Sequence, residues 1–504
     1  MMFHLAQTRI GSPKPVANVG SRRRRLAALA TATFLVITVA GCGGGEGPAA
    51  TATPTRAPTT ATIRPATPGA TPGTPLPTLG TPRPPSAGLG SIAFVRNGNI
   101  WVKNLDTDEE RQLTSDGNNI RPRWSPDGQW LLFQKTMPVD GGFTQVSLWT
   151  MRNDGSGATE IDAGQTYPPV WSPRENRLAY ATAGGLWLVS ADGSNRLEVL
   201  PPSGSPDIRT VAWSPDGQRV IFERWQRTQA ATPTPSTIEG QGLWVVNRDG
   251  TGLAELYSAW DPATVKDTVD IGVWSPDGRW IAVWQGSPDP TARSAGLPVF
   301  VIPATGGSAQ QLASAALPRD TFLAWSPAGD RIAIVEGAGP ETWADKNIVV
   351  ASADGSERQA ISDESVADLA PAWSPDGGQI AFVSEPATEP GQAEQDYPAL
   401  VQIRRIWIMN SDGTDKLQLT SDPNYGDEFP QWSANGQHIL FVRQQAATIG
   451  ATAPATPESQ AAAAEVWLMN ADGSDQRKLA DGLSGGGVGY YGYLDWGQWL
   501  DWYR

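Results

Sequence analysis

The sequence predicts an all-β protein, a single β-propeller of four-stranded blades, from a repeated string and from the strand signals around it. The string is Trp-Ser-Pro-Asp-Gly, complete in four copies and altered in three. These seven copies begin at Trp124, Trp171, Trp213, Trp274, Trp325, Trp373 and Trp432. One unit therefore recurs every 42 to 61 residues, a period typical of repeat architectures.

Each copy of the string predicts a tight turn between two strands. Ser, Pro, Asp and Gly in this order suit a type I turn, because proline fixes φ and glycine adopts the positive φ that other residues resist. A short apolar run follows each turn, as in Ile380 to Phe382 (IAF), and its composition predicts a strand. We call the strand that carries the tryptophan A and the strand after the turn B.

A third and a fourth strand complete the unit. Strand C is an apolar, often Trp-bearing run such as Ile406 to Ile408 (IWI), and it leads into an Asp-Gly pair such as Asp412-Gly413. Asp-Gly between apolar runs is the strongest short hairpin signal. A short strand D, such as Leu417 to Thr420, ends each unit, so the units are interpreted as propeller blades.

The two ends of the repeat region predict eight blades. The first unit begins at Ser91 to Val95, which is already strand B, and we interpret Tyr493 to Trp496 as a final strand A, with Trp496 as its tryptophan. This C-terminal strand would pair with the N-terminal blade and close the ring, which leaves no open sheet edge. Seven blades is the alternative, if one irregular unit is an insertion.

The order of the motifs, WSPDG, IAF, IWIMN and DG, resembles the propeller repeats of the TolB family. The resemblance covers residues 91–504 and implies a TolB-like propeller. The six blades and the separate amino-terminal domain of TolB are not matched here. The resemblance therefore implies none of the partners of TolB for this chain.

The first 90 residues predict export and attachment to a membrane. Arg22 to Arg25 form a basic cluster, Leu26 to Ala40 is an apolar run too short to span a bilayer, and small residues precede Cys42. Val-Ala-Gly-Cys resembles the lipobox of bacterial lipoproteins, which implies a signal peptide over residues 1–41 and a lipidated Cys42. Residues 42–90 are rich in Pro, Thr and Ala and predict an extended linker without a core. We expect an exported propeller over residues 91–504, held at the cell membrane by its lipid anchor and facing the periplasm or the cell exterior.

Charge and composition exclude several classes of function. The whole chain carries a net charge of −14, and removal of residues 1–41, which hold six basic and no acidic side chains, takes it to −20. Such a chain repels nucleic acid, so we expect no nucleic-acid partner. The mature chain would keep one histidine, His438, and one cysteine, which excludes a zinc site with several His or Cys ligands and a Cys nucleophile.

Acidic residues mark the candidate binding site. Asp320, Asp368 and Asp427 each stand five residues before a strand-A tryptophan, where the chain crosses from strand D to the next strand A near the mouth of the central channel. Three such carboxylates could hold a hard cation or meet a basic ligand, and solvated loop acids are the alternative. The other candidate residues near this mouth are Glu428, Tyr425 and Tyr491. We expect no cofactor, unless the three aspartates hold a structural divalent cation.

The function expected from the sequence is a non-enzymatic, monomeric scaffold that binds a protein or a cell-envelope polymer. Its binding face would carry the long loops between strands B and C, at residues 224–241, 384–402 and 443–464. Two alternatives stay open: a glycan-cleaving enzyme that uses channel carboxylates, and a structural spacer. The sequence does not name the ligand.

Overall fold

The computed structural model is all-β, as expected from the sequence. The structure describes residues 88–139, 143–164, 168–182, 185–201, 207–227, 238–258, 268–270, 272–286, 296–338, 346–362, 366–386, 403–445, 464–483 and 495–504. Within these ranges the chain forms antiparallel sheets and two short 3-10 helices, and no α-helix occurs. No helix among the described residues is long and apolar enough to cross a membrane.

Six sheets have four strands each and keep the expected order A, B, C, D. The first three are formed by β4 (Asn119–Trp124), β5 (Trp130–Val139), β6 (Phe143–Arg152) and β7 (Thr159–Asp162); β8 (Val170–Trp171), β9 (Arg177–Thr182), β10 (Gly185–Ser190) and β11 (Leu197–Leu200); β12 (Asp207–Trp213), β13 (Arg219–Arg227), β14 (Ile238–Asn247) and β15 (Ala254–Ser258). The next three are formed by β16 (Thr268–Asp270), β17 (Trp280–Gly286), β18 (Leu297–Pro303) and β19 (Gln310–Ala316); β20 (Leu323–Trp325), β21 (Arg331–Glu336), β22 (Asn347–Ser352) and β23 (Arg358–Ala360); β24 (Val366–Trp373), β25 (Gln379–Pro386), β26 (Arg405–Asn410) and β27 (Leu417–Gln418).

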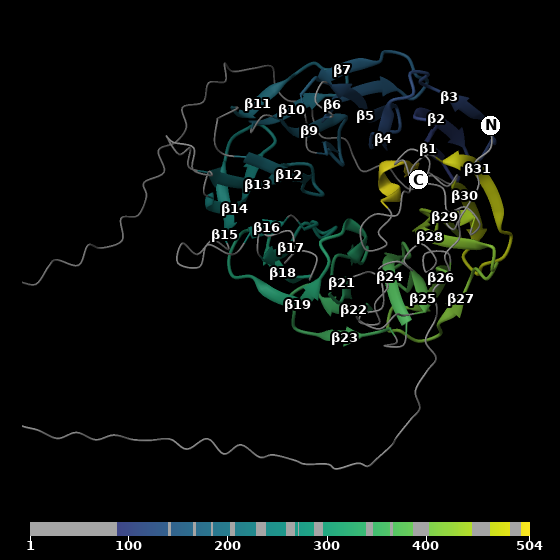
Figure 1. Ribbon diagram of the computed structural model, residues 1–504. Helices are drawn as coiled ribbons and strands as arrows, with labels where there is room; N and C mark the ends of the chain where they lie inside the picture. The colour runs from purple at the N-terminus through teal and green to yellow at the C-terminus, as the bar shows by residue number, and fades with distance from the viewer. Residues whose placement is uncertain are drawn as a thin grey trace, which may run out of the picture. The chain divides into compact units, whose positions relative to one another are not determined.

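The remaining eight strands form one larger sheet that joins the two ends of the described chain. It contains β28 (Tyr425–Trp432), β29 (His438–Gln445), β30 (Ala464–Asn470), β31 (Arg477–Leu483), β1 (Ser91–Arg96), β2 (Asn99–Asn104), β3 (Glu110–Gln112) and β32 (Leu500–Tyr503). The 3-10 helices are η1 (Asp320–Phe322) and η5 (Trp496–Gln498). The sheets follow one another in chain order around a common centre, an arrangement consistent with a propeller (Figure 1).

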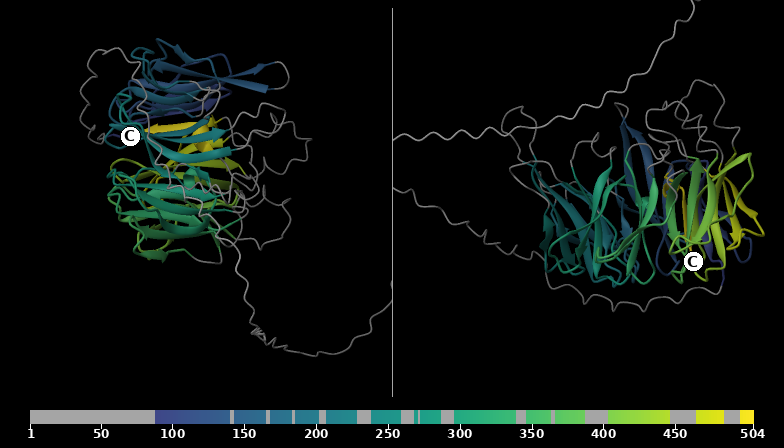
Figure 2. Two further views of the ribbon diagram at one scale, coloured as in Figure 1. Left: turned by 90° about the vertical axis from the view of Figure 1, so that its left-hand side faces the viewer. Right: turned by 90° about the horizontal axis from the view of Figure 1, so that it is seen from below.

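The sheets pack face to face through apolar side chains. One buried cluster combines Val335 from β21, Phe382 from β25 and Phe441 from β29, so it spans three consecutive sheets. The strands stand side by side when the sheets are seen from below, and the β5–β6 hairpin projects beyond its neighbours (Figure 2). Most of the core thus lies between sheets, with strand A of each sheet on the inside.

The repeated turn is held by its own serine and aspartate. In the copy after β24, the Ser374 hydroxyl donates to Asp376 at 2.6 Å and accepts the Gln379 backbone N–H at 2.9 Å, while Gly377 adopts a φ of 71°. The hydrogen bonds from Ser374 and from the Gly378 N–H favour the ionised carboxylate and lower the pKa of Asp376. The same Ser-to-Asp hydrogen bond occurs in all four complete copies, where it holds the turn between strands A and B.

The tryptophan of the motif fastens each sheet to the one before it. Its indole N–H donates to the carbonyl oxygen of the residue that precedes the tryptophan of the previous sheet. This bond is made by Trp171 to Arg123 (3.1 Å), Trp213 to Val170 (3.3 Å), Trp325 to Val273 (2.9 Å), Trp373 to Ala324 (2.8 Å) and Trp432 to Ala372 (3.0 Å). The indoles of Trp124 and Trp274 have no partner among the described residues.

The closing strand lies at a different place from the one predicted. Trp496 belongs to η5, and the strand that pairs with β1 is β32, with Trp502 opposite Ile92. This register matches that of Trp373 opposite Ile380, so Trp502 holds the position expected for Trp496. The prediction was wrong because the last unit has lost its Trp-Ser-Pro-Asp-Gly turn, which leaves three nearby tryptophans, Trp496, Trp499 and Trp502, without the signal that distinguishes them.

Replacing Trp432 by Phe should destabilise the fold more than replacing Trp124 by Phe. Both changes remove an indole from a buried strand-A position, but only Trp432→Phe leaves the Ala372 carbonyl without its donor. We expect a difference of about 1 kcal/mol in the free energy of unfolding, measured by urea denaturation. Equal losses in the two variants would show that the indole bond does not fasten the sheets.

Candidate functional site

The inner strands surround a cavity of about 310 Å³. Its walls come from β4, β20, β24, β28 and β32, with η1 and η5 completing the rim, so five inner strands contribute. The lining side chains are Arg123, Asp320, Thr321, Leu323, Ala370, Pro371, Ala372, Phe429, Pro430, Gln431, Leu500 and Asp501, beside Gly497. This cavity is the candidate functional site, since pockets where several elements converge are the usual place for a ligand.

Three of the inner strands share an unusual backbone at the cavity. Arg121, Ala370 and Phe429 have positive φ values of 56°, 49° and 58°, and each is followed by proline. The pairing with strand B shifts register at these points, because proline has no N–H to donate to the ladder. A positive φ before proline is strained, so the surrounding sheets must hold these bulges in place.

The cavity carries charges of both signs. Asp320, in η1, is exposed to the solvent of the cavity, yet protein around it displaces water and Asp495 lies nearby. Both effects raise the pKa of Asp320, and the guanidinium groups of Arg123, Arg121 and Arg319 oppose the rise without cancelling it. Among the described residues, the Arg123 guanidinium makes one hydrogen bond, in which it donates to the carbonyl of the neighbouring Pro122 at 2.9 Å.

Asp501, on the closing strand β32, lines the cavity beside Leu500. Its carboxylate accepts the Trp124 backbone N–H at 2.7 Å, which joins β32 to β4. Burial raises the pKa of Asp501, and the neighbouring Arg123 and Arg504 moderate that rise. The closing strand is therefore part of the cavity and of its electrostatics.

Of the three aspartates predicted to face the channel together, the structure places only Asp320 at the cavity. Asp368 and Asp427 are 1% and 0% exposed and lie in the interior between sheets. Their backbone N–H groups donate to the carbonyls of Lys346 at 2.9 Å and Arg404 at 3.1 Å, in the preceding sheet. The predicted set of three channel carboxylates is therefore wrong.

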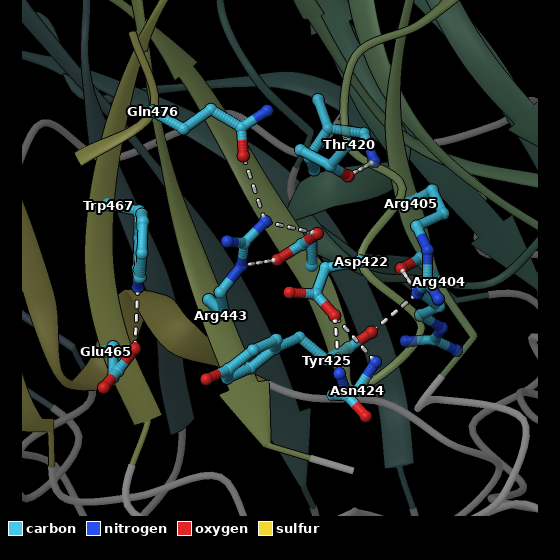
Figure 3. Close-up of polar contacts among 12 residues, drawn as sticks. Arg404, Arg405, Thr420, Asp422, Asn424, Tyr425, Arg443, Glu465, Trp467 and Gln476 are labelled. Carbon is cyan, nitrogen blue, oxygen red and sulfur yellow. Dashed lines mark hydrogen bonds and ion pairs between the residues drawn. The ribbon is translucent and has the colours of Figure 1, made fainter. Parts of the chain in front are cut away.

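Asp427 is paired within its own sheet. The Arg443 guanidinium donates to its two carboxylate oxygens at 2.6 and 3.1 Å and to Gln476 at 3.3 Å. The same guanidinium lies over the rings of Tyr425 at 5.2 Å and Trp467 at 4.5 Å (Figure 3). The predicted site residue Tyr425 thus packs on a structural arginine.

Glu428 belongs to a second buried cluster. The Arg404 guanidinium donates to Glu428 at 2.7 Å and to Glu385 at 2.9 Å, and the Trp496 indole N–H donates to the other oxygen of Glu428 at 2.8 Å. Burial and the nearby Glu428 raise the pKa of the fully buried Glu385, against the opposing effect of Arg404. The cluster connects β25, β28 and η5, and among the described residues it contains two carboxylates and one guanidinium.

The remaining predictions concern Tyr491 and the long loops, which lie largely outside the described residues, and a possible metal site. Tyr491 and most of the three long loops lie outside the described residues. No group of three or more His, Cys, Asp or Glu side chains that could hold a metal occurs in the described part of the chain. His438 begins β29, where its backbone N–H donates to the Ser433 hydroxyl at 2.9 Å.

Apart from Asp320, the residues that line the cavity were not among the predicted site residues. Arg123 and Asp501 each immediately precede a strand-A tryptophan, and Ala372 and Gln431 hold the same position in their units. A signal was available in the strings RPRW, APAW and FPQW, which place a proline two residues before the tryptophan. A proline inside a strand indicates a bulge, and bulges often accompany functional sites.

Comparison with curated proteins finds relatives over parts of the chain, and no family model matches it. An uncharacterized protein of Agrobacterium fabrum is 27% identical over 25% of this chain and 47% of its own length. The uncharacterized peptidase YuxL of Bacillus subtilis is 24% identical over 32% of this chain and 28% of its own length. Tricorn protease homolog 2 of Streptomyces coelicolor is 29% identical over 38% of this chain and 16% of its own length. The matches therefore span less than half of each relative.

Solved structures show the same fold type. Dipeptidyl peptidase 4 of Porphyromonas gingivalis aligns with a TM-score of 0.51 at 13% identity, over 80% of this chain and 62% of its own. A TolB protein from Agrobacterium tumefaciens aligns with a TM-score of 0.35 at 16% identity, over 82% of this chain and 98% of its own. The neighbours thus include TolB proteins and a peptidase, and the alignment with dipeptidyl peptidase 4, at 13% identity, shows a likeness of fold alone.

These comparisons correct the expected function. A non-enzymatic scaffold was expected, but YuxL and the Streptomyces relative are both named as peptidases or proteases. A scaffold was favoured over the glycan-cleaving alternative because the mature chain would lack a catalytic set of His and Cys residues. The lack of these residues excludes only the chemistry that needs them, so the expectation of a non-enzymatic scaffold was wrong.

Replacing Glu385 by Gln should leave stability at pH 7 unchanged or raised, because the neutral amide removes the surplus buried charge and its oxygen can still accept from Arg404. Replacing Arg404 by Met should lower the free energy of unfolding by about 3 to 5 kcal/mol, since two carboxylates then lose their buried partner. Thermal or urea unfolding measures both. A large loss in Glu385→Gln would show that Glu385 is needed in its ionised form.

The same cluster predicts a pH dependence. The pKa of Glu385 is raised in the folded chain, so its ionisation favours unfolding. The stability of the unsubstituted protein relative to Glu385→Gln should therefore increase as the pH falls from 7 toward 4.5, the ordinary pKa of a glutamate. A constant difference between the two proteins over this range would contradict the assignment.

Proposed function

We propose that this chain is a peptidase-type propeller that receives peptides at its central cavity and acts in their hydrolysis. The observation that carries the proposal is the cavity itself, which is lined by main-chain bulges, by the Arg123 and Asp320 charges and by the apolar Leu323 and Phe429. Such a lining offers polar and apolar contacts to an extended peptide. The peptidase names of two relatives support the same class of substrate.

The proposal includes a closed ring of eight blades. Six sheets of four strands account for six blades, and the eight-stranded sheet contains the strands of two more, β28 to β31 and β32 with β1 to β3. The pairing of β32 with β1 supports closure by strands from both ends of the chain. A closed ring would hold the inner strands rigidly around the cavity.

The proposal also places the protein outside the cytoplasm on a lipid anchor. The Val-Ala-Gly-Cys sequence before the Pro- and Thr-rich segment supports lipidation at Cys42. The linker of residues 42–90 would let the propeller reach peptides at a distance from the membrane. The peptides would then be those of the cell envelope or the surroundings.

Filling the cavity should abolish peptide turnover. Ala372 lines the cavity, and Ala372→Trp would occupy much of it while leaving the Ala372 carbonyl for Trp432. We expect the unsubstituted full chain to cleave members of a peptide mixture analysed by mass spectrometry, and Ala372→Trp to cleave at least tenfold more slowly. Ala360→Trp, at an exposed position of β23, is the matched control and should cleave normally. Absence of cleavage by the unsubstituted chain, or normal cleavage by Ala372→Trp, would refute the proposal.

Replacing Cys42 by Ser should release the protein from the membrane fraction. The substitution removes the thiol that would carry the lipid, while Thr51→Ser in the linker is a control that should stay with the membrane. Fractionation of the native host followed by immunoblotting measures both. Retention of Cys42→Ser in the membrane fraction would exclude Cys42 as the anchor.

A further inference from the structure

Two opposite charges line the cavity without pairing. Among the described residues, the Asp320 carboxylate makes no hydrogen bond or ion pair, and the Arg123 guanidinium makes no ion pair and donates only to the Pro122 carbonyl. The other cavity carboxylate, Asp501, already accepts the Trp124 N–H. The protein thus leaves one anionic and one cationic group facing the same space.

Opposite charges within reach of each other normally form an ion pair, so these two are held apart by the elements that carry them. Arg123 belongs to β4, where the bulge at Arg121 and Pro122 fixes the strand just before it. Asp320 belongs to η1, from a sheet far along the chain. Leu323 and Phe429 provide an apolar wall of the same cavity.

We propose that the cavity binds a small zwitterion, a free α-amino acid or a short peptide, with its ammonium group at Asp320 and its carboxylate at Arg123. The inference rests on the proposed function and names the form of substrate or product that this site takes. A guanidinium binds a carboxylate through two parallel hydrogen bonds, and a carboxylate accepts the N–H groups of an ammonium. An apolar side chain of the ligand would contact Leu323 and Phe429.

The size of the cavity favours a short ligand. At about 310 Å³ it stands at the lower end of the range for small-molecule sites. A ligand that carries both charges would satisfy Asp320 and Arg123 together, whereas a lone cation or anion would satisfy one of them. We therefore expect the site to recognise the terminal ammonium and the terminal carboxylate of a short peptide.

Calorimetric titration of the full chain with end-blocked ligands tests the inference. The probes are the dipeptide Ala-Phe, its N-acetyl form, its C-terminal amide and free phenylalanine. We expect Ala-Phe or phenylalanine to bind, and each blocked dipeptide to bind at least tenfold more weakly than Ala-Phe. Tighter binding of phenylalanine would assign the site to free amino acids, and tighter binding of Ala-Phe to short peptides; both support the proposal.

Two substitutions test which residue binds which end of the dipeptide. Asp320→Asn should remove the preference for the free amino end and keep the preference for the free carboxyl end, and Arg123→Gln should do the reverse. Glu357→Gln and Arg477→Gln, at exposed positions, change the net charge equally and should retain both preferences. A misfolded variant would lose both preferences at once, so the selective loss is specific to the site.

Equal binding of free and blocked dipeptides, or no binding of any probe, overturns the inference. These outcomes are distinct from failure of the proposed function. If the zwitterions bind as expected but no peptide is cleaved, the peptidase proposal fails and the site stands. If cleavage depends on an open cavity but blocked and free ends bind alike, the zwitterion site fails and the function stands.

Discussion

The pairing of β32 with β1 is the constraint on which the central cavity depends. It joins residues 500–503 to the first strand of the described chain, with Phe94 opposite Leu500 and Ile92 opposite Trp502. The indole of Trp502 donates to the Leu89 carbonyl at 2.8 Å, and Arg504 donates to the Trp432 carbonyl in the preceding inner strand. Without this pairing, Leu500 and Asp501 would leave the cavity wall and Trp124 would lose the acceptor of its backbone N–H.

Two sets of charged side chains near this closing strand have different surroundings: one set is buried between sheets, and the other faces the cavity. The side chains of Glu385, Arg404 and Glu428 are buried and are joined to one another and to the Trp496 indole by hydrogen bonds, so this cluster connects separate elements and is not open to a ligand. Asp320 and Arg123, by contrast, face the cavity without an ion-pair partner among the described residues. A binding function is therefore more reasonable for these two side chains than for the deeper acids.

The fold was predictable from the sequence because its signals are local. The Trp-Ser-Pro-Asp-Gly turn, the apolar runs and the Asp-Gly turns each specify a short segment, and the structure has strands where these signals predicted them. The closing strand was misplaced by six residues, from Trp496 to Trp502, because its turn signal is absent. The side of a strand that faces the cavity was harder to predict, since it depends on pairing between distant segments.

Asp368 and Asp427 show why the side of a strand that faces the cavity was hard to predict. Side chains alternate between the two faces of a strand, so residues one and five positions before the tryptophan should share a face. In β24 and β28 the bulge at the Ala370 and Phe429 positions interrupts this alternation, and Asp368 and Asp427 turn into the interior between sheets. Before Trp325 the strand is shorter: β20 begins at Leu323, and Asp320 lies in the 3-10 helix η1, which places it at the cavity.

Amide hydrogen exchange at residues 500–503 tests the account most directly. If β32 closes the sheet on β1, its paired amides should exchange as slowly as those of the inner strands β24 and β28, by a factor of at least about a thousand relative to an unprotected chain. Substituting Trp502 by Ala should speed exchange both in β32 and at Ile92 to Val95. Rapid exchange at residues 500–503 in the unsubstituted protein would contradict the pairing and, with it, the cavity built on it.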